Sequence, residues 1–236
     1  GQGARPSPRT GDPMTRRMIP ALIFGVAGVA ILIWLGTWQL QRLAWKTGIL
    51  DRIEARITAE PVSLPAAPDR STDQYLRVLE SGAIEPGELH VYTSAPPRGV
   101  GYRIIVPLRL ADGRRILLDR GFVPIEEKDA PRLVGPIRVE GSLLWPDETD
   151  GYTSAPDRAK NIWFARDVGL MSAALDTLPA MLVTEASDDP NPPWARPVTI
   201  DIPNDHLQYA ITWFSLAVAW AGMTVYWLWR IKRRSD

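Results

Sequence analysis

One of the chain's two histidines stands beside aromatic residues near the C-terminus, and this group has the clearest potential for chemistry. His206 is followed by Tyr209 and Trp213, three and seven positions later. In a helix this spacing places the three side chains on one face. An imidazole beside a flat aromatic surface can ligate the iron of a haem whose macrocycle lies against the helix. The alternative is an interfacial histidine that hydrogen-bonds to water, to lipid head groups or to a neighbouring helix.

Other combinations of reactive residues give weaker indications. Asp119 could be the catalytic carboxylate of a membrane-anchored hydrolase, but a charge pair with the adjacent arginine beside a turn is the simpler interpretation. His90 lies in a predicted strand, and the chain has no Gly-x-Ser-x-Gly motif. Gly99-Val100-Gly101 lacks the third glycine of a dinucleotide-binding loop. Three isolated acids in proline-rich loops are predicted to be solvated: Asp188, Asp189 and Asp201. We therefore expect that the protein is not an enzyme.

Composition excludes several further classes. The formal net charge is zero and no basic face stands out, so binding to nucleic acid is not expected. The absence of cysteine excludes disulfides, thiolate catalysis and metal sites that use cysteine sulfur. With two histidines and five scattered methionines, a soft copper site is difficult to assemble, which disfavours a copper chaperone.

Two long apolar segments free of charged residues, one near each end of the chain, must position His206. They are residues 18–41 and 207–229. A helix of about 20 residues, rising about 1.5 Å per residue, crosses a hydrocarbon core of about 30 Å. A cleaved signal peptide would have a shorter apolar region followed by small residues, whereas residues 38–42 read Trp-Gln-Leu-Gln-Arg. We therefore expect a membrane hairpin.

Basic residues predict the orientation of this hairpin. Arg230, Lys232, Arg233 and Arg234 follow the second span, and such clusters are retained on the cytoplasmic side. Two spans then place both termini in the cytoplasm and the intervening domain in the periplasm. The expected location is the bacterial cytoplasmic (inner) membrane, with the lipid bilayer as the first partner.

The sequence divides into six predicted segments. They are a disordered N-terminal segment (1–17), a transmembrane helix (18–41), a stalk helix (42–60), a periplasmic β-rich domain (61–202), a second transmembrane helix (203–229) and a basic cytoplasmic tail (230–236). Short runs of apolar residues with the spacing typical of β-strands predict strands at 75–84, 89–94, 102–110, 115–123, 137–145 and 181–186. A short helix is expected at 168–176, with Asp167 as its N-cap. The fold class is therefore a membrane α-helical hairpin plus an α+β, mainly antiparallel β domain, either a small barrel or an open sheet.

Five ordered blocks of this sequence resemble the surfeit locus protein one family. Residues 35–46, LGTWQLQRLAWK, and 203–214, PNDHLQYAITWF, are similar to its signatures at the exit of the first span and the entry of the second. Between them, residues 101–103, 118–124 and 161–167 are similar to family blocks in the same order. The resemblance covers residues 18–230. Asp205 stands where the family usually has Asn, and Phe122 where Trp is common.

The resemblance implies a factor for biogenesis of the respiratory chain, namely assembly of haem-copper cytochrome c oxidase. The cofactor would be haem a, with His206 as the ligand of the haem iron. The partners would be the catalytic subunit of the oxidase and haem a synthase. The alternative is a cofactor-free membrane chaperone that stabilises a nascent oxidase subunit.

Further residues would complete a haem site at the outer membrane surface. Tyr209, Trp213 and Trp38 would provide aromatic contacts, and Arg42 or Lys46 could meet the propionates. Arg42 and Lys46 have an alternative role, which is to anchor the helix by reaching toward lipid head groups. Small residues spaced four apart should let the two helices approach closely: Ala21 and Gly25 in the first, Ala217 and Ala221 in the second.

Overall fold

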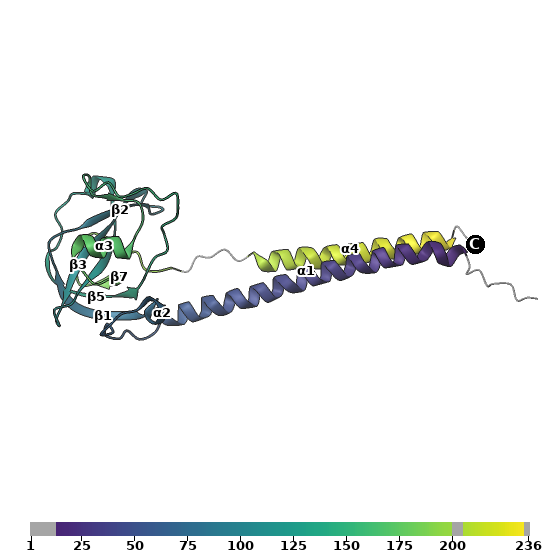
Figure 1. Ribbon diagram of the computed structural model, residues 1–236, viewed down its shortest axis with the longest axis horizontal. Coiled ribbons are helices and arrows are strands. Elements are labelled where there is room, and N and C mark those ends of the chain that lie inside the picture. Colours follow the sequence, from purple (N-terminus) through teal and green to yellow (C-terminus); the bar gives the residue numbers. More distant parts are fainter. Residues whose placement is uncertain (1–12, 200–204, 234–236) are drawn as a thin grey trace, which may run out of the picture. The chain divides into compact units, whose positions relative to one another are not determined.

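The computed structural model describes residues 13–199 and 205–233, which divide into two compact units. The first unit comprises residues 1–50 and 201–236, and its described part consists of two helices (Figure 1). The second unit, residues 51–200, contains a β-sheet and short helices.

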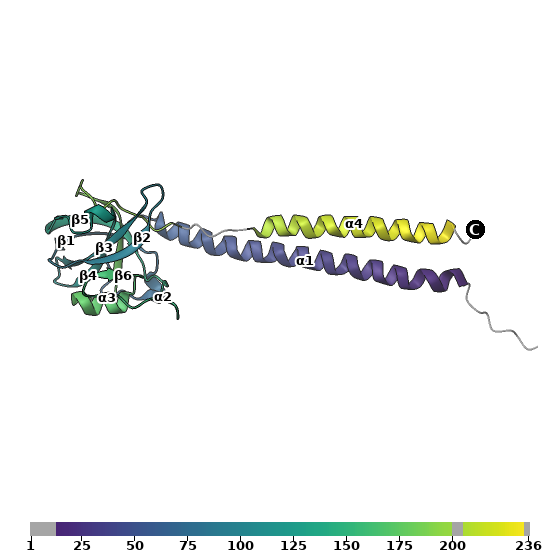
Figure 2. The same cartoon turned by 90° about the horizontal axis from the view of Figure 1, so that it is seen from above.

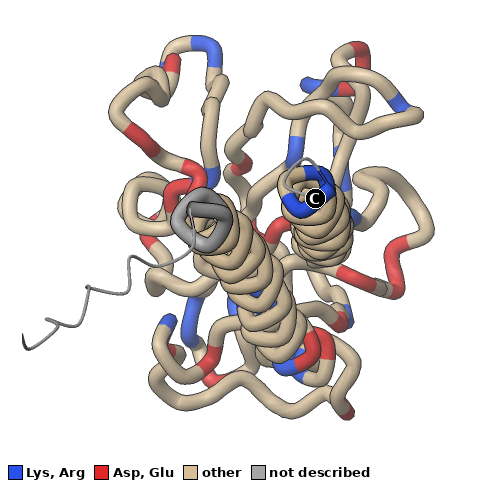
Figure 3. Tube along the Cα trace, turned by 90° about the vertical axis from the view of Figure 1, so that its right-hand side faces the viewer, with Lys and Arg blue, Asp and Glu red and all other residues tan. Residues whose placement is uncertain are grey.

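Each of the two long helices has an extensive apolar surface. α1 spans Pro13–Ile57 and α4 spans His206–Arg233. Both are long and apolar enough to cross a membrane, and only 11% and 6% of their most apolar windows are buried, unlike core helices of soluble proteins. Figure 3 shows α4 without charged residues over most of its length and with Lys and Arg at its C-terminal end.

α1 extends in both directions beyond the predicted first span. Its continuous helix includes residues 42–57 of the predicted stalk helix (42–60), so the helix ends three residues earlier than expected. At the other end, α1 begins at Pro13, inside the segment 1–17 that was expected to be disordered, and residues 1–12 lie outside the described part. Proline suits the first turn of a helix because its missing N–H has no helical acceptor there.

α1 and α4 run antiparallel, as Figures 1 and 2 show. They pack against each other through small residues. A Cβ atom added to Gly28 would lie 2.2 Å from Nε1 of Trp220, and one added to Gly36 would lie 2.7 Å from the Phe214 ring. A Cβ atom added to Gly25 would likewise overlap the side chain of Thr224. Three alanines are also buried: Ala21, Ala210 and Ala217. The glycines therefore form a flat strip on α1 against which large side chains of α4 lie, which is the close approach predicted from the sequence.

The second unit is built on a seven-stranded sheet with strand order β1-β5-β7-β4-β3-β2-β6. The strands are β1 Arg77–Ile84, β2 Leu89–Ser94, β3 Val100–Leu110, β4 Arg115–Pro124, β5 Gly135–Leu143, β6 Ile162–Trp163 and β7 Met181–Ser187. Only the β2–β6 and β4–β7 pairs are parallel. β1 also pairs with β3 over three residues, so the sheet curls strongly. The fold is thus a mixed, mostly antiparallel sheet and not a closed barrel.

The strand predictions are confirmed except near their ends. Tyr75 has a φ of 68°, so the chain enters β1 only at Arg77, two residues later than expected. β5 begins and ends two residues before its predicted bounds, at Gly135 and Leu143. Three elements were not predicted because they are too short to show periodicity: α2 Arg70–Asp73, the 3₁₀ helix η1 Ile125–Glu127, and β6.

α3 lies at Val168–Leu175, close to the predicted helix. Its N-cap is confirmed, because the Asp167 side chain accepts a hydrogen bond from the backbone N–H of Leu170. Asp176 adopts a left-handed conformation at the C-cap and ends the helix.

The core of the domain centres on β3 and β4, which are buried at nearly every position. Ile104, Leu108, Ile116 and Leu118 have no exposed surface. Burial of each such side chain contributes about 1.5–3 kcal/mol. Strands buried on both faces show continuous apolar runs in place of alternation, which explains the apolar sequences of these two strands.

A charged cluster lies beside β2. The Glu88 carboxylate is 2.7 Å from Nε2 of the buried His90 and 2.6 Å from the Arg132 guanidinium. Burial raises the pKa of the Glu88 carboxyl, but the hydrogen bond from His90 and the charge of Arg132 outweigh it, so the pKa lies below its ordinary 4.5. The ionised form of Glu88 is therefore more stable in the folded domain than in the unfolded chain.

The glycine strip predicts that a larger side chain at Gly28 separates the helices. Gly28→Leu should lengthen the distance between spin labels attached to cysteines at exposed positions 22 and 225, because leucine would overlap Trp220. Such overpacking costs about 1–3 kcal/mol. Gly222→Leu is the matched control, since nothing lies within 4 Å of a Cβ at Gly222. Equal label distances in the two variants would contradict this packing.

The Glu88 cluster predicts a pH-dependent stability. Because the folded pKa is lowered, the contribution of Glu88 is complete above pH 4.5 and is lost as the pH falls through the folded pKa. Glu88→Gln should lower the free energy of unfolding at pH 7 by about 1–3 kcal/mol. The difference from the wild type should shrink below pH 4.5, measured as unfolding midpoints from neutral to acidic pH. A constant difference across this range would refute the assignment, and the exposed Glu126→Gln provides the control.

Candidate functional site

His206, the predicted ligand, is the first residue of α4 and makes a specific contact with α1. Its Nδ1 lies 2.7 Å from the side-chain amide oxygen Oε1 of Gln39. Gln39 stands one helical turn after Gly36, where the two helices approach closely. Both residues are half-buried, so the contact is partly shielded from solvent.

This contact determines which nitrogen of the imidazole carries the proton. An amide oxygen can only accept a hydrogen bond, so Nδ1 of His206 must be the donor. In the neutral ring, Nε2 then holds the lone pair. Nε2 makes no hydrogen bond to any residue in the described part of the chain, and it is therefore available to a ligand.

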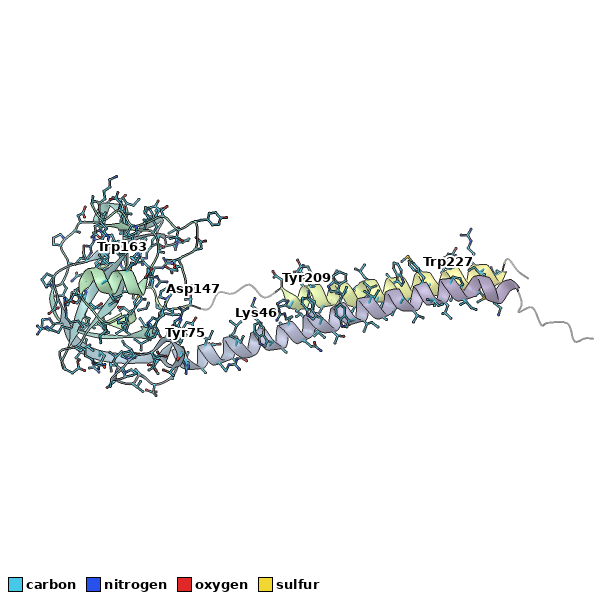
Figure 4. The ribbon with its side chains drawn as sticks, in the orientation of Figure 1. Lys46, Tyr75, Asp147, Trp163, Tyr209 and Trp227 are labelled. Atoms are coloured by element: carbon cyan, nitrogen blue, oxygen red, sulfur yellow. The ribbon has the colours of Figure 1, made fainter. Side chains whose placement is uncertain are left out.

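The predicted aromatic neighbours of His206 lie on the same helix. Tyr209 is 54% exposed, and Trp213 is half-buried near the contact between the helices. Figure 4 shows Tyr209 at the beginning of α4, close to the part of α1 that carries Lys46. The spacing of the three residues on α4 places them on one face, as the sequence predicted.

The predicted residues of α1 form a second group. The Arg42 guanidinium lies 5.8 Å from the ring centre of Trp38 and 5.2 Å from that of Trp45, within cation–π range. Trp38 and Arg42 are exposed and Lys46 is half-buried. The stacking of Arg42 on two tryptophans fits the anchoring role, and binding of propionates by Arg42 or Lys46 stays a prediction.

The donor set at this end of the hairpin fits a haem. A neutral imidazole with a free Nε2 is the usual axial ligand of haem iron, and exposed aromatic rings can lie against a macrocycle. Farther along the same helices, an apolar hollow of about 310 Å³ is lined by residues of both, including Ile31, Leu216 and Trp220. No group of three or more His, Asp or Glu side chains suited to a bare metal ion occurs within residues 13–199 and 205–233.

Asp119, the other candidate for chemistry, is a buried structural residue. Its carboxylate accepts hydrogen bonds from Arg103 at 2.7 Å, from Arg166 at 3.2 Å and from the backbone of Gly121 at 3.0 Å. The side chain has no exposed surface. Breaking a buried pair of this kind typically costs about 3–5 kcal/mol. These contacts favour a charge pair over a catalytic carboxylate, but the partners are Arg103 and Arg166 and not the adjacent Arg120, which was expected.

The glycine that follows has its own structural reason. Gly121 has a φ of 114°, and a Cβ there would lie 2.0 Å from the carbonyl oxygen of Trp194. Only glycine permits the backbone of β4 to turn and approach Trp194 this closely. The segment Asp119-Arg120-Gly121 is therefore explained by packing.

One expectation about the loop acids is wrong. Asp189 was predicted to be solvated, but its side chain is 6% exposed and pairs with Arg120 at 2.7 Å. Arg120 is a strand residue distant in sequence, so only the folded chain reveals this pair. Asp188 is exposed, and Asp201 lies outside the described residues.

Gln39 is the residue that reasoning from sequence did not assign to the site. Gln39 lies in the block of residues 35–46 that resembles the family, but no partner was predicted for it. A signal was present, because Gln39 is an amide near the C-terminal end of a charge-free span, and an amide shielded from water requires a hydrogen-bond partner.

Comparisons with known proteins agree with the resemblance of the five sequence blocks. The SURF1 family model matches residues 26–218. A SURF1-like protein from Monosiga brevicollis is 30% identical over 88% of this chain and 84% of its own length. Surfeit locus protein 1 is 27% identical in Rattus norvegicus, over 85% of this chain and 70% of its own. The Homo sapiens protein is also 27% identical, over 86% and 72%.

The matched region includes Gly28 and Gly36 of the glycine strip on α1, both partners of the His206–Gln39 hydrogen bond and the whole sheet domain. This chain belongs to the SURF1 family.

Proposed function

We propose that the protein is an assembly factor for haem-copper cytochrome c oxidase that aids the delivery of haem a to the catalytic subunit or its insertion there. The observation that carries this proposal is the half-buried His206, whose Nδ1 is bonded to Gln39 and whose Nε2 is available. Membership of the SURF1 family and the resemblance described above support the oxidase as the target.

The two long helices support a membrane location. Each is long and apolar enough to cross a bilayer, and basic residues end α4. In the proposed arrangement both termini are cytoplasmic, and the sheet domain is in the periplasm of a bacterium. His206 then lies at the outer surface of the membrane, because it is at the opposite end of α4 from the basic residues.

The proposed roles of the site residues follow from their chemistry. Nε2 of His206 would ligate the iron, and Tyr209, Trp213 and Trp38 would contact the flat macrocycle. Arg42 and Lys46 of α1 would bind the propionate groups through their positive charges. Bound haem a would be the cargo in transfer to the oxidase. The apolar hollow beside Ile31, Leu216 and Trp220 suits the hydrocarbon parts of such a molecule.

The proposed partners are the catalytic subunit of the oxidase, which receives the haem, and haem a synthase, which supplies it. A cofactor-free membrane chaperone is the alternative function. Large exposed side chains along the helices, such as Trp34 at 65% and Val218 at 74%, favour it because they could contact the helices of a nascent subunit.

The proposal predicts a haem spectrum that depends on His206. Protein purified from cells that make haem a should carry a Soret band, and His206→Ala should weaken it strongly because the axial ligand is lost. Gln208→Ala, which changes an exposed residue on the same helix, should retain the band. Absorption spectra at equal protein concentration provide the measurement.

Two outcomes separate the proposal from its alternative. Colourless wild-type protein would count against haem binding. Normal oxidase assembly with His206→Ala, together with loss of assembly when residues 61–202 are deleted, would instead support the chaperone.

A further inference from the structure

We infer that Gln39 is a positioning residue that holds His206 in the tautomer able to bind a metal through Nε2. The inference uses the proposed function only for the identity of the bound group, since the tautomer belongs to the protein without haem. The supporting observation is the hydrogen bond between two helices, from Nδ1 of His206 to Oε1 of Gln39, at 2.7 Å.

The amide oxygen imposes a preference that free histidine does not have. In water, neutral histidine carries its proton mainly on Nε2. Gln39 offers an acceptor at Nδ1, so the proton must move to Nδ1 for the hydrogen bond to form. Leaving the amide oxygen of Gln39 unpaired in this half-buried setting is unfavourable, and this cost opposes the ordinary tautomer preference.

The packing of the helices fixes this acceptor in place. Gly36, one turn before Gln39 on α1, is buried against Phe214 of α4, and a side chain there would push the helices apart. Gly36 lets α1 and α4 approach closely, and this close approach allows the Gln39 side chain to reach His206. A flexible surface glutamine would lack this constraint and would hold the ring less firmly.

The choice of an amide has a consequence for metal binding. An acceptor on Nδ1–H raises the basicity of Nε2, and carboxylates do so more strongly than neutral amides. Gln39 thus orients the ring without making the histidine as strong a ligand as a carboxylate would. A moderate ligand is suited to a protein that must release its cargo.

The first test measures the tautomer without haem. Protein labelled with ¹⁵N-histidine is placed in lipid nanodiscs at a pH well above about 6.5, the ordinary pKa of histidine. The two histidine signals are assigned by comparison with His206→Gln. The wild type should show His206 with a protonated Nδ1 and an unprotonated Nε2.

Variants of Gln39 then test its role. Gln39→Leu should shift His206 toward the Nε2–H form, and Gln39→Glu should keep the proton on Nδ1 because it retains an acceptor oxygen. Gln41→Leu, at an exposed position two residues away, is the control and should leave the spectrum unchanged. If Gln39→Leu keeps the wild-type tautomer, the inference is wrong whether or not the protein binds haem.

The second test uses haem-loaded protein. Gln39→Leu should weaken haem binding by about 10–100-fold, the usual effect of removing a residue that orients a metal ligand. The reduction potential of the iron should rise in Gln39→Leu and fall in Gln39→Glu, and a purely structural link between the helices would not produce these opposite shifts. If neither the wild type nor any variant binds haem, the proposed function is wrong. The ¹⁵N measurement still decides the role of Gln39 in that case.

Discussion

The contact between the two long helices is the constraint on which the rest of the candidate site depends. Gly25, Gly28 and Gly36 leave no room for side chains of their own, so Thr224, Trp220 and Phe214 of α4 lie directly on the backbone of α1. In a lipid bilayer the hydrophobic effect does not drive two helices together, because the lipid tails are as apolar as the helices. Close packing of side chains against backbone takes its place. The same close approach brings Gln39 within hydrogen-bond distance of His206. The site is therefore a product of helix packing.

The sheet domain, unlike the helix pair, is stabilised by an apolar core that also contains a few buried charge pairs. Asp119 is enclosed between Arg103 and Arg166, and Arg120 pairs with Asp189. Buried pairs of this kind add little net stability over apolar residues, but the loss of one partner is costly. They join segments distant in sequence, so they favour one arrangement of the loops around β4. This explains a conspicuous acid, Asp119, without assigning it any chemistry.

Much of the fold could be predicted because local patterns and tertiary structure agree. Alternating and apolar runs predicted six of the seven strands, and Asp167 predicted the start of α3. The misses have local causes. A two-residue strand such as β6 has no period, and the positive φ of Tyr75 delays β1. Whether the sheet closes depends on strand order and curl, and no single strand carries that information.

The sequence alone determined the two apolar spans and the residues of the domain between them. It also placed His206 at the start of the second helix. All three follow from length, charge and spacing, which are local properties of the chain. The sequence also identified the family through ordered blocks. Only the tertiary structure brought an acceptor oxygen to Nδ1 of His206, because that oxygen belongs to Gln39, 167 residues away. The burial of Asp189 likewise required the folded chain, since solvation of an acid depends on what packs against it.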